Sequence, residues 1–278
     1  MPSSEAMSKT DALGIIGIGA MGTVFAKGLA HAAKQVFVSD ADEAKLACFV
    51  KAHPHCLPLG NAQLIQRSNW VVFAVKPGVY PKLLADNAKH IQPEALLVGL
   101  AAGLKLSQLQ AFSEGRGRWV RVMPNLPATV GEGMLSVCAP EGAEEAPLAD
   151  FLEALRALGR VDLLPEELMN VATAVSGSGP AYAFVFMEAL ADAAVRLGMD
   201  RMRARQHAAQ TLLGAAKLCL ESLASPAHLK DAVVTPGGTT AEGLYALEAA
   251  GFRKAVLDAV LAAATKAQQL SGAKPPSS

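Results

Sequence analysis

Three glycines of this chain lie at a spacing that suits the binding of a pyrophosphate group. Gly17, Gly19 and Gly22 follow the apolar run LGII and open a segment of helical character. In such a strand, loop and helix, the first glycine permits a tight turn and the second lets a pyrophosphate approach the backbone, while the third lets the helix pack closely on the strand. A glycine-rich turn without a ligand is the alternative, but the strand before the loop and the helix after it favour a dinucleotide cofactor.

An acidic residue roughly twenty positions further on bears on the choice of cofactor. Asp40 closes the run QVFVSD, where a carboxylate accepts hydrogen bonds from the adenosine ribose hydroxyls and repels a 2′-phosphate. The next residues, Ala41, Asp42 and Glu43, supply no cation to neutralise such a phosphate. The alternative is that Asp40 caps the next helix, where aspartate is common. The ribose interpretation predicts that NADH is preferred over NADPH.

Two later stretches, rich in glycine and hydroxyl groups, interrupt helical sequence. Val175–Tyr182 reads VSGSGPAY, with proline in the first turn of the helix that follows, and Thr235–Gly243 reads TPGGTTAEG. We interpret both as loops that open into helix N-termini, whose free amides and positive dipole end suit an anion such as a substrate carboxylate. A capped turn between helices is the alternative for each stretch.

The segments that would position these loops divide the chain into two parts. In the first half, short runs of strand length alternate with helical segments; the runs are LGIIG, QVFVSD, WVVFAV, ALLVGL and RWVRVM, with GRVDLL as a further candidate. Such alternation predicts a Rossmann-type, doubly wound parallel α/β sheet, and the long Ala/Leu-rich segments after it predict an all-helical domain. We expect a disordered extension over 1–12, an NAD(P)-binding domain over 13–164, a helical domain over 165–272 and a disordered tail over 273–278.

Composition excludes several classes of protein. The 278 residues carry 25 basic and 25 acidic side chains, which gives no electrostatic footprint for nucleic acid or for an anionic membrane surface. No run reaches the roughly 18 apolar residues of a membrane span, and the N-terminus lacks the apolar core of a signal peptide. Four cysteines without CxxC spacing indicate a reduced protein, which we expect in the cytoplasm. Cys48, His53, His55 and Cys56 lack zinc-site spacing, so no metal is expected.

Several motifs occur in the order found in pyrroline-5-carboxylate reductases. Besides the glycine motif, these are AVKP (74–77), GLAAG (99–103), RVMPN (121–125), SGSGPAY (176–182) and LKDAVVTPGGTTAEGL (229–244). The chain resembles this family from about Gly14 to its last helix. The resemblance implies reduction of 1-pyrroline-5-carboxylate to L-proline, the last step of proline biosynthesis, with hydride from NADPH or NADH. It also implies a homodimer, or a higher homo-oligomer built from dimers, with the active site between one subunit's nucleotide domain and helices that include the partner's.

The resemblance further implies roles for individual residues. Those expected to bind the cofactor are Gly17, Ile18, Gly19, Ala20 and Met21 at the pyrophosphate, Asp40 at the ribose, Asn61 at the adenosine, and Ala74, Val75, Lys76, Pro77, Leu100 and Ala102 toward the nicotinamide. Those expected to bind the substrate are Glu166, Thr235, Gly238, Thr239 and Thr240. The amides of 238–240 and the Thr235 hydroxyl would take the carboxylate, and the Thr240 hydroxyl, as the catalytic group, would reach the ring nitrogen. Lys76 is alternatively an exposed loop cation.

The chain departs from the family pattern in two places, and two other functions stay open. Ser39-Asp40-Ala41 stands where members often carry a segment suited to a 2′-phosphate, and Ala232 stands where some members place an asparagine near both ligands. One alternative is a β-hydroxyacid-type dehydrogenase, although its GxxGxxxK segment is not evident in the sequence. The other is a nucleotide-sensing module without turnover, which the intact TPGGTT loop argues against.

The apolar content of the chain exceeds what one small domain needs to bury. Hydrophobic residues make up 51% of the chain and charged residues only 18%, and much of the excess lies in the helices after Pro165. Helices that are apolar on more than one face pack against something beyond their own domain. We therefore predict an obligate interface between subunits.

Overall fold

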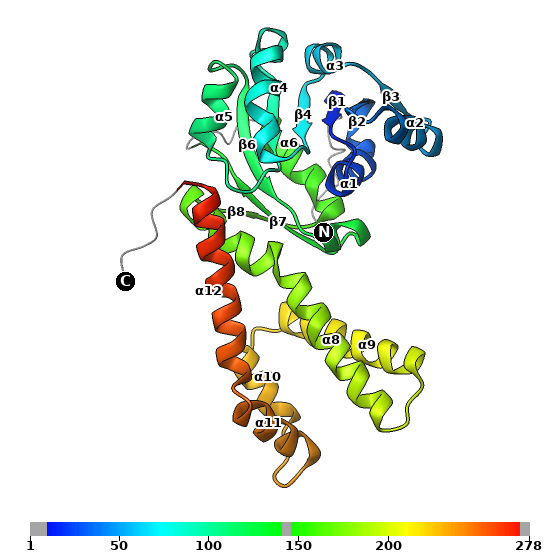
Figure 1. Ribbon diagram of the computed structural model, residues 1–278, viewed down its shortest axis with the longest axis vertical. Coiled ribbons are helices and arrows are strands. Elements are labelled where there is room, and N and C mark those ends of the chain that lie inside the picture. Colours follow the sequence, from blue (N-terminus) through cyan, green and yellow to red (C-terminus); the bar gives the residue numbers. More distant parts are fainter. Residues whose placement is uncertain (1–9, 141–145, 273–278) are drawn as a thin grey trace. The chain divides into compact units, whose positions relative to one another are not determined.

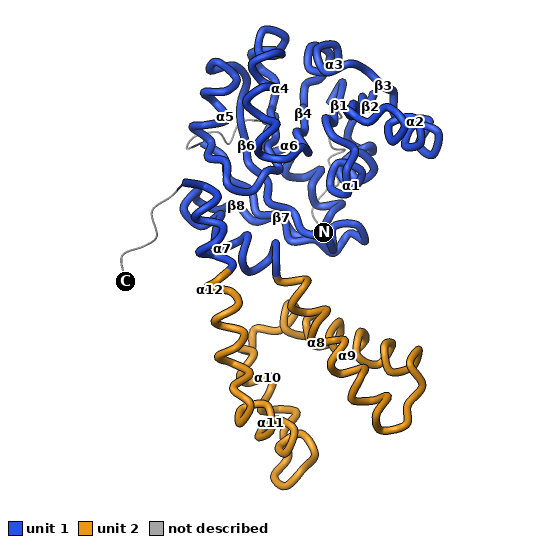
Figure 2. The backbone as a smooth tube through the Cα atoms, viewed as in Figure 1, with its two compact units in different colours: residues 1–178, 263–278 blue, residues 179–262 orange. Residues whose placement is uncertain are grey.

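The computed structural model describes residues 10–140 and 146–272. The chain forms two compact units, one made of residues 1–178 and 263–278 and the other of residues 179–262 (Figure 2). We call them the first and the second unit.

The first unit is built on one eight-stranded sheet with the order β3-β2-β1-β4-β5-β6-β7-β8 (Figure 1). The strands are β1 (Thr10–Ile16), β2 (Ala33–Ser39), β3 (Cys56–Pro58), β4 (Trp70–Phe73), β5 (Leu96–Gly99), β6 (Arg118–Met123), β7 (Gly133–Cys138) and β8 (Gly159–Leu163). Neighbouring strands run parallel, except that β6 and β7 are antiparallel. The expected Rossmann-type, doubly wound sheet is thereby confirmed.

Helices cover both faces of this sheet because its strands are apolar on both sides. In β1, Leu13 and Ile15 face one core, whereas Ala12 and Ile16 face the other. The helices that supply side chains to the first core are α1 (Ala20–Gly28), α2 (Glu43–Ala52) and α6 (Ala146–Leu155). Those that supply the second core are α3 (Asn61–Arg67), α4 (Tyr80–Asn87) and α5 (Leu106–Phe112).

The structure corrects the expectation at the N-terminus. Residues 10–12, expected to be disordered, begin β1, and Ala12 is buried in the second core. The rest of the expected extension and the tail over 273–278 lie outside the described residues. Strands β3 and β7 had not been predicted, because β3 has only three residues and β7 carries a serine between apolar positions.

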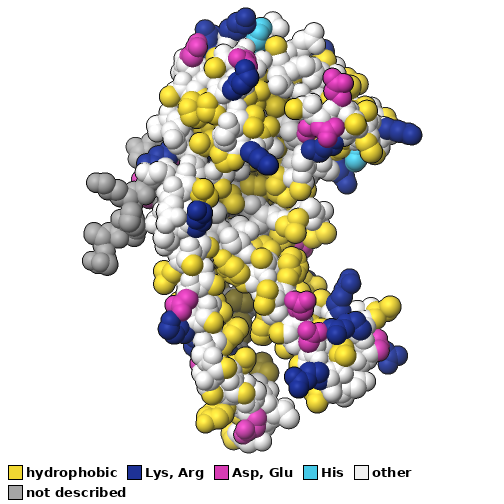
Figure 3. Space-filling model, viewed as in Figure 1, with side chains coloured by type: hydrophobic (Ala, Val, Ile, Leu, Met, Phe, Trp, Pro, Cys, Tyr) yellow, Lys and Arg dark blue, Asp and Glu magenta, His cyan; other side chains and the backbone are white. Residues whose placement is uncertain are grey.

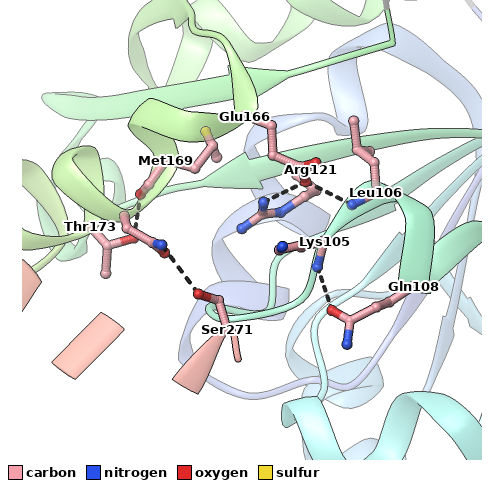
Figure 4. Close-up of polar contacts among 9 residues, drawn as sticks. Lys105, Leu106, Gln108, Arg121, Glu166, Met169, Thr173 and Ser271 are labelled. Atoms are coloured by element: carbon pink, nitrogen blue, oxygen red, sulfur yellow. Dashed lines mark hydrogen bonds and ion pairs between the residues drawn. The ribbon is translucent and has the colours of Figure 1, made fainter. Parts of the chain in front are cut away.

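The compact units divide the chain at a different place from the expected boundary at residue 165. Beyond β8, the short helix α7 (Met169–Ala172) buries Met169 in the first unit, and a π-helical turn (Thr173–Gly177) runs directly into α8 (Gly179–Arg196). The interpretation of SGSGP as a loop is therefore wrong: this stretch is helical. The last residues of α12 (Phe252–Leu270) also belong to the first unit, where Ser271 Oγ accepts a hydrogen bond from Asn170 Nδ2 at 3.2 Å (Figure 4).

The second unit is all-helical and buries little. It contains α8, α9 (Arg201–Glu221), α10 (Pro226–Val233), α11 (Thr239–Ala249) and the start of α12. Within residues 179–262 only Ala191, Ala204 and Ala208 are buried. Large apolar side chains lie at the surface instead (Figure 3), among them Val185, Leu213, Leu218, Tyr245 and Leu257. The apolar surplus of the sequence is thus exposed in this unit. None of the helices in the described residues is long and apolar enough to cross a membrane.

Candidate active site

The glycine loop at the start of α1 has the geometry that its spacing predicts. Gly17 has a φ of +95°, which side chains rarely tolerate, and a Cβ on Gly22 would lie 1.8 Å from the Gly17 carbonyl oxygen. A Cβ on Gly19 would meet nothing within 4 Å, so the backbone is open to a ligand at that residue alone of the three. A groove of about 610 Å³ adjoins the loop at Ile18, Gly19 and Ala20.

The residues expected to bind the cofactor meet at one edge of the sheet. Backbone hydrogen bonds join the strand ends there: Gly17 N donates to Ser39 O at 2.7 Å, and Ala74 N to Ile16 O at 2.8 Å. All thirteen follow the carboxyl ends of β1 to β5, namely Gly17, Ile18, Gly19, Ala20, Met21, Asp40, Asn61, Ala74, Val75, Lys76, Pro77, Leu100 and Ala102. Ligands of open α/β sheets bind at this edge.

Asp40 is tied to the glycine loop. Its carboxylate accepts hydrogen bonds from Ile18 N at 2.6 Å, from Asp42 N at 3.0 Å and from Lys45 Nζ at 3.0 Å. Burial by itself would raise the pKa of Asp40, but these donors outweigh it, so the pKa is lowered and the group stays ionised. The side chain that caps α2 is Asp42, which accepts from Lys45 N. Lys45, two residues beyond Glu43, is a cation of this turn that had not been predicted.

Two further side chains, those of Ser39 and Tyr80, form hydrogen bonds at the edge of the sheet where the cofactor is expected to bind. Ser39 Oγ donates to Asn61 Oδ1 at 2.7 Å, which directs the Asn61 amide nitrogen away from Ser39. The buried Tyr80 hydroxyl donates to Phe73 O at 2.6 Å and accepts from Leu100 N at 3.2 Å. Burial raises the pKa of Tyr80 well above its ordinary value, so the hydroxyl keeps its proton. No pattern in the sequence distinguishes Tyr80, which lies on α4 among other core residues.

Glu166 lies in the first unit, at the start of the 3₁₀ turn Glu166–Leu168. Its Oε1 accepts from Leu106 N at 2.7 Å and from Arg121 Nη1 at 2.8 Å (Figure 4). Burial, followed by the charge of Glu166, raises the pKa of the adjacent Cys138 thiol to about 11. Arg121 belongs to the RVMPN motif, and its signal in the sequence is a charge between the apolar residues Val120 and Val122 of β6.

The other four expected substrate residues lie together in the second unit. Gly237 has a φ of +67°, Gly238 N donates to Thr235 O at 2.9 Å, and α11 begins at Thr239. This confirms the interpretation of Thr235–Gly243 as a loop that opens into a helix N-terminus. A Cβ on Gly238 would lie 2.3 Å from Thr235 Oγ1, so a side chain at this position would displace the Thr235 hydroxyl. Thr240 is half-buried as the second residue of the helix.

The described residues contain no group of three or more His, Cys, Asp or Glu side chains that could hold a metal ion. His53 instead stacks on Phe49, with ring centroids 4.4 Å apart, and Cys56 is buried in β3.

Comparisons with known proteins now identify the family. A family model described as pyrroline-5-carboxylate reductase dimerisation matches residues 166–270, and one described as NADP oxidoreductase, coenzyme F420-dependent, matches residues 12–103. The chain is 39% identical over 273 residues to pyrroline-5-carboxylate reductase 3 of Macaca fascicularis, covering 96% of this chain and 99% of that protein. The chain belongs to the pyrroline-5-carboxylate reductase family.

Other pyrroline-5-carboxylate reductases support this assignment. The protein of Methanosarcina acetivorans is 39% identical over 263 residues, covering 93% of this chain and 97% of that one. The crystal structure of the Plasmodium falciparum enzyme, which has NADP bound, matches with a TM-score of 0.85 at 30% identity, covering 96% of this chain and all of that one. The family expected from the motifs is confirmed, and the chain is an NAD(P)-dependent oxidoreductase.

The β-hydroxyacid alternative finds no support beyond the fold. The 3-hydroxyisobutyrate dehydrogenase of Mycobacterium tuberculosis matches with a TM-score of 0.52 at 16% identity. This chain and the 3-hydroxyisobutyrate dehydrogenase therefore share an architecture. A shared architecture does not by itself imply a shared reaction.

Proposed function

We propose that this protein reduces 1-pyrroline-5-carboxylate to L-proline, the final step of proline biosynthesis, with a hydride from a nicotinamide cofactor. The observation that carries the proposal is the 39% identity to pyrroline-5-carboxylate reductases along almost the whole chain. The glycine loop, with open space at Gly19, and the helix N-terminus at Thr239 supply the two kinds of anion site that such a reaction needs.

The first unit would hold the cofactor. The amides of 17–21 suit the pyrophosphate, Asp40 the ribose hydroxyls and Asn61 the adenosine, while Ala74–Pro77, Leu100 and Ala102 would line the nicotinamide side. When bound, the cofactor supplies the hydride that reduces the imine carbon. The chain's part on this side is positioning, since hydride transfer needs the reacting carbons about 3 to 3.5 Å apart.

The remaining residues would bind the substrate and manage its proton. The amides of Gly238, Thr239 and Thr240 and the Thr235 hydroxyl would take the carboxylate. The Thr240 hydroxyl would form a hydrogen bond with the ring nitrogen, and the Glu166 carboxylate would favour its cationic form. The balance is one hydride to the imine carbon and one proton on nitrogen, so the C=N double bond becomes a C–N single bond. A protonated imine accepts hydride more readily than a neutral one.

An assay of NADH and NADPH oxidation tests this function. Turnover with 1-pyrroline-5-carboxylate, and none with a 3-oxo acid, is the expected result. Turnover with the 3-oxo acid alone would favour the β-hydroxyacid alternative, and cofactor binding without turnover would favour a nucleotide sensor. A six-membered cyclic imine carboxylate, run in parallel, reports whether the substrate is the five-membered ring.

We further infer that NADH is the preferred cofactor. Asp40 stays ionised, and Lys45, the nearby cation, is already paired with it at 3.0 Å. Asp42 and Glu43 add negative charge to the same turn, so a 2′-phosphate would meet net repulsion. The Plasmodium falciparum relative was solved with NADP, which makes this preference a property to be tested in the present chain.

Asp40→Ser is expected to raise the NADPH/NADH ratio of kcat/KM by about tenfold or more. The change removes the repelling charge and leaves Lys45 available to a 2′-phosphate. Asp11→Ser is the matched control, because Asp11 also pairs with a lysine, Lys34, but does so exposed at the amino ends of β1 and β2. A ratio that rises equally in both variants, or in neither, would show that Asp40 does not set the preference.

We also propose a homodimer, or a larger assembly of dimers, formed through the second unit. This unit has only three buried residues and carries an apolar groove of about 530 Å³ between α8, α11 and α12. The groove is lined by Tyr182, Val185, Phe186, Ala189, Leu190, Leu247, Phe252, Ala255, Val256 and Ala259. Its exposure to water is unfavourable, and the match of residues 166–270 to a dimerisation family supports a second copy as the occupant.

Val185→Asp is expected to convert the assembly to smaller species, because it would bury an unpaired carboxylate in the interface. Light scattering coupled to size exclusion measures the mass. Val130→Asp is the control: Val130 is also an exposed valine, but it lies in the first unit. An unchanged mass for Val185→Asp, or an active wild-type monomer, would contradict the proposed interface.

A further inference from the structure

Arg121, a buried cation of the first unit, is not among the residues proposed to bind the cofactor or the substrate. Arg121 lies on β6, in register with Gly99 of β5 and Cys138 of β7, and its side chain is only 8% exposed. Burying a guanidinium costs several kcal/mol unless it is paired. Its ion-pair partner is Glu166, and its Nε has no hydrogen-bond partner among the described residues. Such an incompletely satisfied buried arginine calls for a reason beyond stability.

The geometry of the partner carboxylate supplies that reason. Arg121 Nη1 and Leu106 N both donate to the same atom, Glu166 Oε1, at 2.8 and 2.7 Å. The two donors come from β6 and from the start of α5, and Figure 4 shows them converging on the carboxylate. Since Oε1 is engaged twice, Oε2 is the oxygen left for a ligand. The Glu166 side chain is 31% exposed, so a ligand can reach it.

If the Arg121–Glu166 ion pair served stability alone, we would expect the arginine to engage both carboxylate oxygens. An arginine and a carboxylate gain most from such a bidentate pair. In this site both hydrogen bonds engage one oxygen, and Glu166 follows β8 and contacts the first residue of α5. The ligand chemistry that suits a fixed, ionised carboxylate is a cationic nitrogen, such as the protonated ring nitrogen of a cyclic imine or of its secondary amine product.

We propose that Arg121 is a positioning residue for the reaction, which fixes Glu166 so that Oε2 receives the cationic ring nitrogen of the substrate. The inference rests on the proposed function. Arg121 acts through Glu166: its hydrogen bond to Oε1 sets the orientation of the carboxylate.

The test compares Arg121→Met with Arg118→Met in the full-length enzyme. Arg118 lies on the same strand, but it pairs with Glu94 at the surface, so its loss controls for removal of a β6 arginine. We expect Arg121→Met to raise the KM for 1-pyrroline-5-carboxylate about tenfold, with the KM for NADH nearly unchanged. Arg121→Lys should restore much of the affinity for the substrate, because it keeps a cation beside Glu166.

The outcomes separate the two proposals. A wild-type enzyme without reductase activity would overturn the proposed function and this inference with it. An active wild type in which Arg121→Met unfolds at lower temperature, but keeps the wild-type substrate KM, would overturn the inference alone. If Arg121→Met does not fold, Glu166→Gln decides, because it keeps an acceptor for Leu106 N: a wild-type KM for 1-pyrroline-5-carboxylate in this variant excludes the role of the pair.

Discussion

Gly19→Ala is expected to weaken NADH binding about 100-fold, or about 2.7 kcal/mol, while the fold stays intact. An added Cβ at Gly19 meets no atom within 4 Å, and the residue has a φ of −76°, so neither a clash nor backbone strain destabilises the free enzyme. The methyl group would stand where the pyrophosphate approaches the amides of the loop. The loss should therefore fall on the complex alone.

Two matched alanine variants make this expectation specific. Gly60→Ala also adds a Cβ in open space at a helix N-cap, that of α3, and should leave both the melting temperature and the Kd for NADH close to the wild-type values. Gly22→Ala would place its Cβ 1.8 Å from the Gly17 carbonyl oxygen and should lower the melting temperature as well. Thermal unfolding and NADH fluorescence titration measure the two effects. A Gly19→Ala enzyme with wild-type affinity would remove the pyrophosphate from this loop.

The difference between Gly19 and Gly22 also shows what the sequence could predict. The spacing of the glycines predicts a separate structural role for each, and the contacts of each glycine agree with that prediction. The prediction was possible because the strand, the turn and the helix that surround these glycines are consecutive in the sequence. Five apolar runs and GRVDLL likewise indicated six of the strands. The SGSGP stretch misled because glycine, serine and proline are typical of loops, whereas here a π-helical turn carries the chain directly into α8.

The supporting contacts of the site could not be predicted, because they join residues distant in the chain. Arg121 meets Glu166 across 45 positions, and Leu106 meets it across 60. Tyr80 supports the loop at Leu100 across 20 positions, from a helix whose pattern indicates only a core side chain. Lys45 is only five residues from Asp40 in the sequence. Its ammonium group reaches the Asp40 carboxylate at the end of β2 because the first turn of α2 brings the chain back toward that strand. Such contacts follow from the order of the strands, which composition and spacing do not specify.

Thr240→Ala is expected to lower kcat/KM for 1-pyrroline-5-carboxylate about 100-fold, within the range of general acid–base effects. Thr240 is the second residue of α11, directly after the Gly237–Gly238 turn, so its hydroxyl and the amides proposed to take the carboxylate belong to one rigid segment. Loss of the hydroxyl leaves the ring nitrogen without its hydrogen bond as the imine becomes an amine. The amides remain, so the substrate should still bind.

Thr240→Ser provides the control, because it keeps the hydroxyl and removes only a methyl group; it should retain most of the wild-type kcat/KM. The Kd for NADH should be the same in all three proteins, since the residues proposed to hold the cofactor belong to the other compact unit. Steady-state kinetics and NADH titration therefore distinguish a chemical role from a general loss of structure. A Thr240→Ala enzyme within twofold of wild type would exclude the hydroxyl from the reaction.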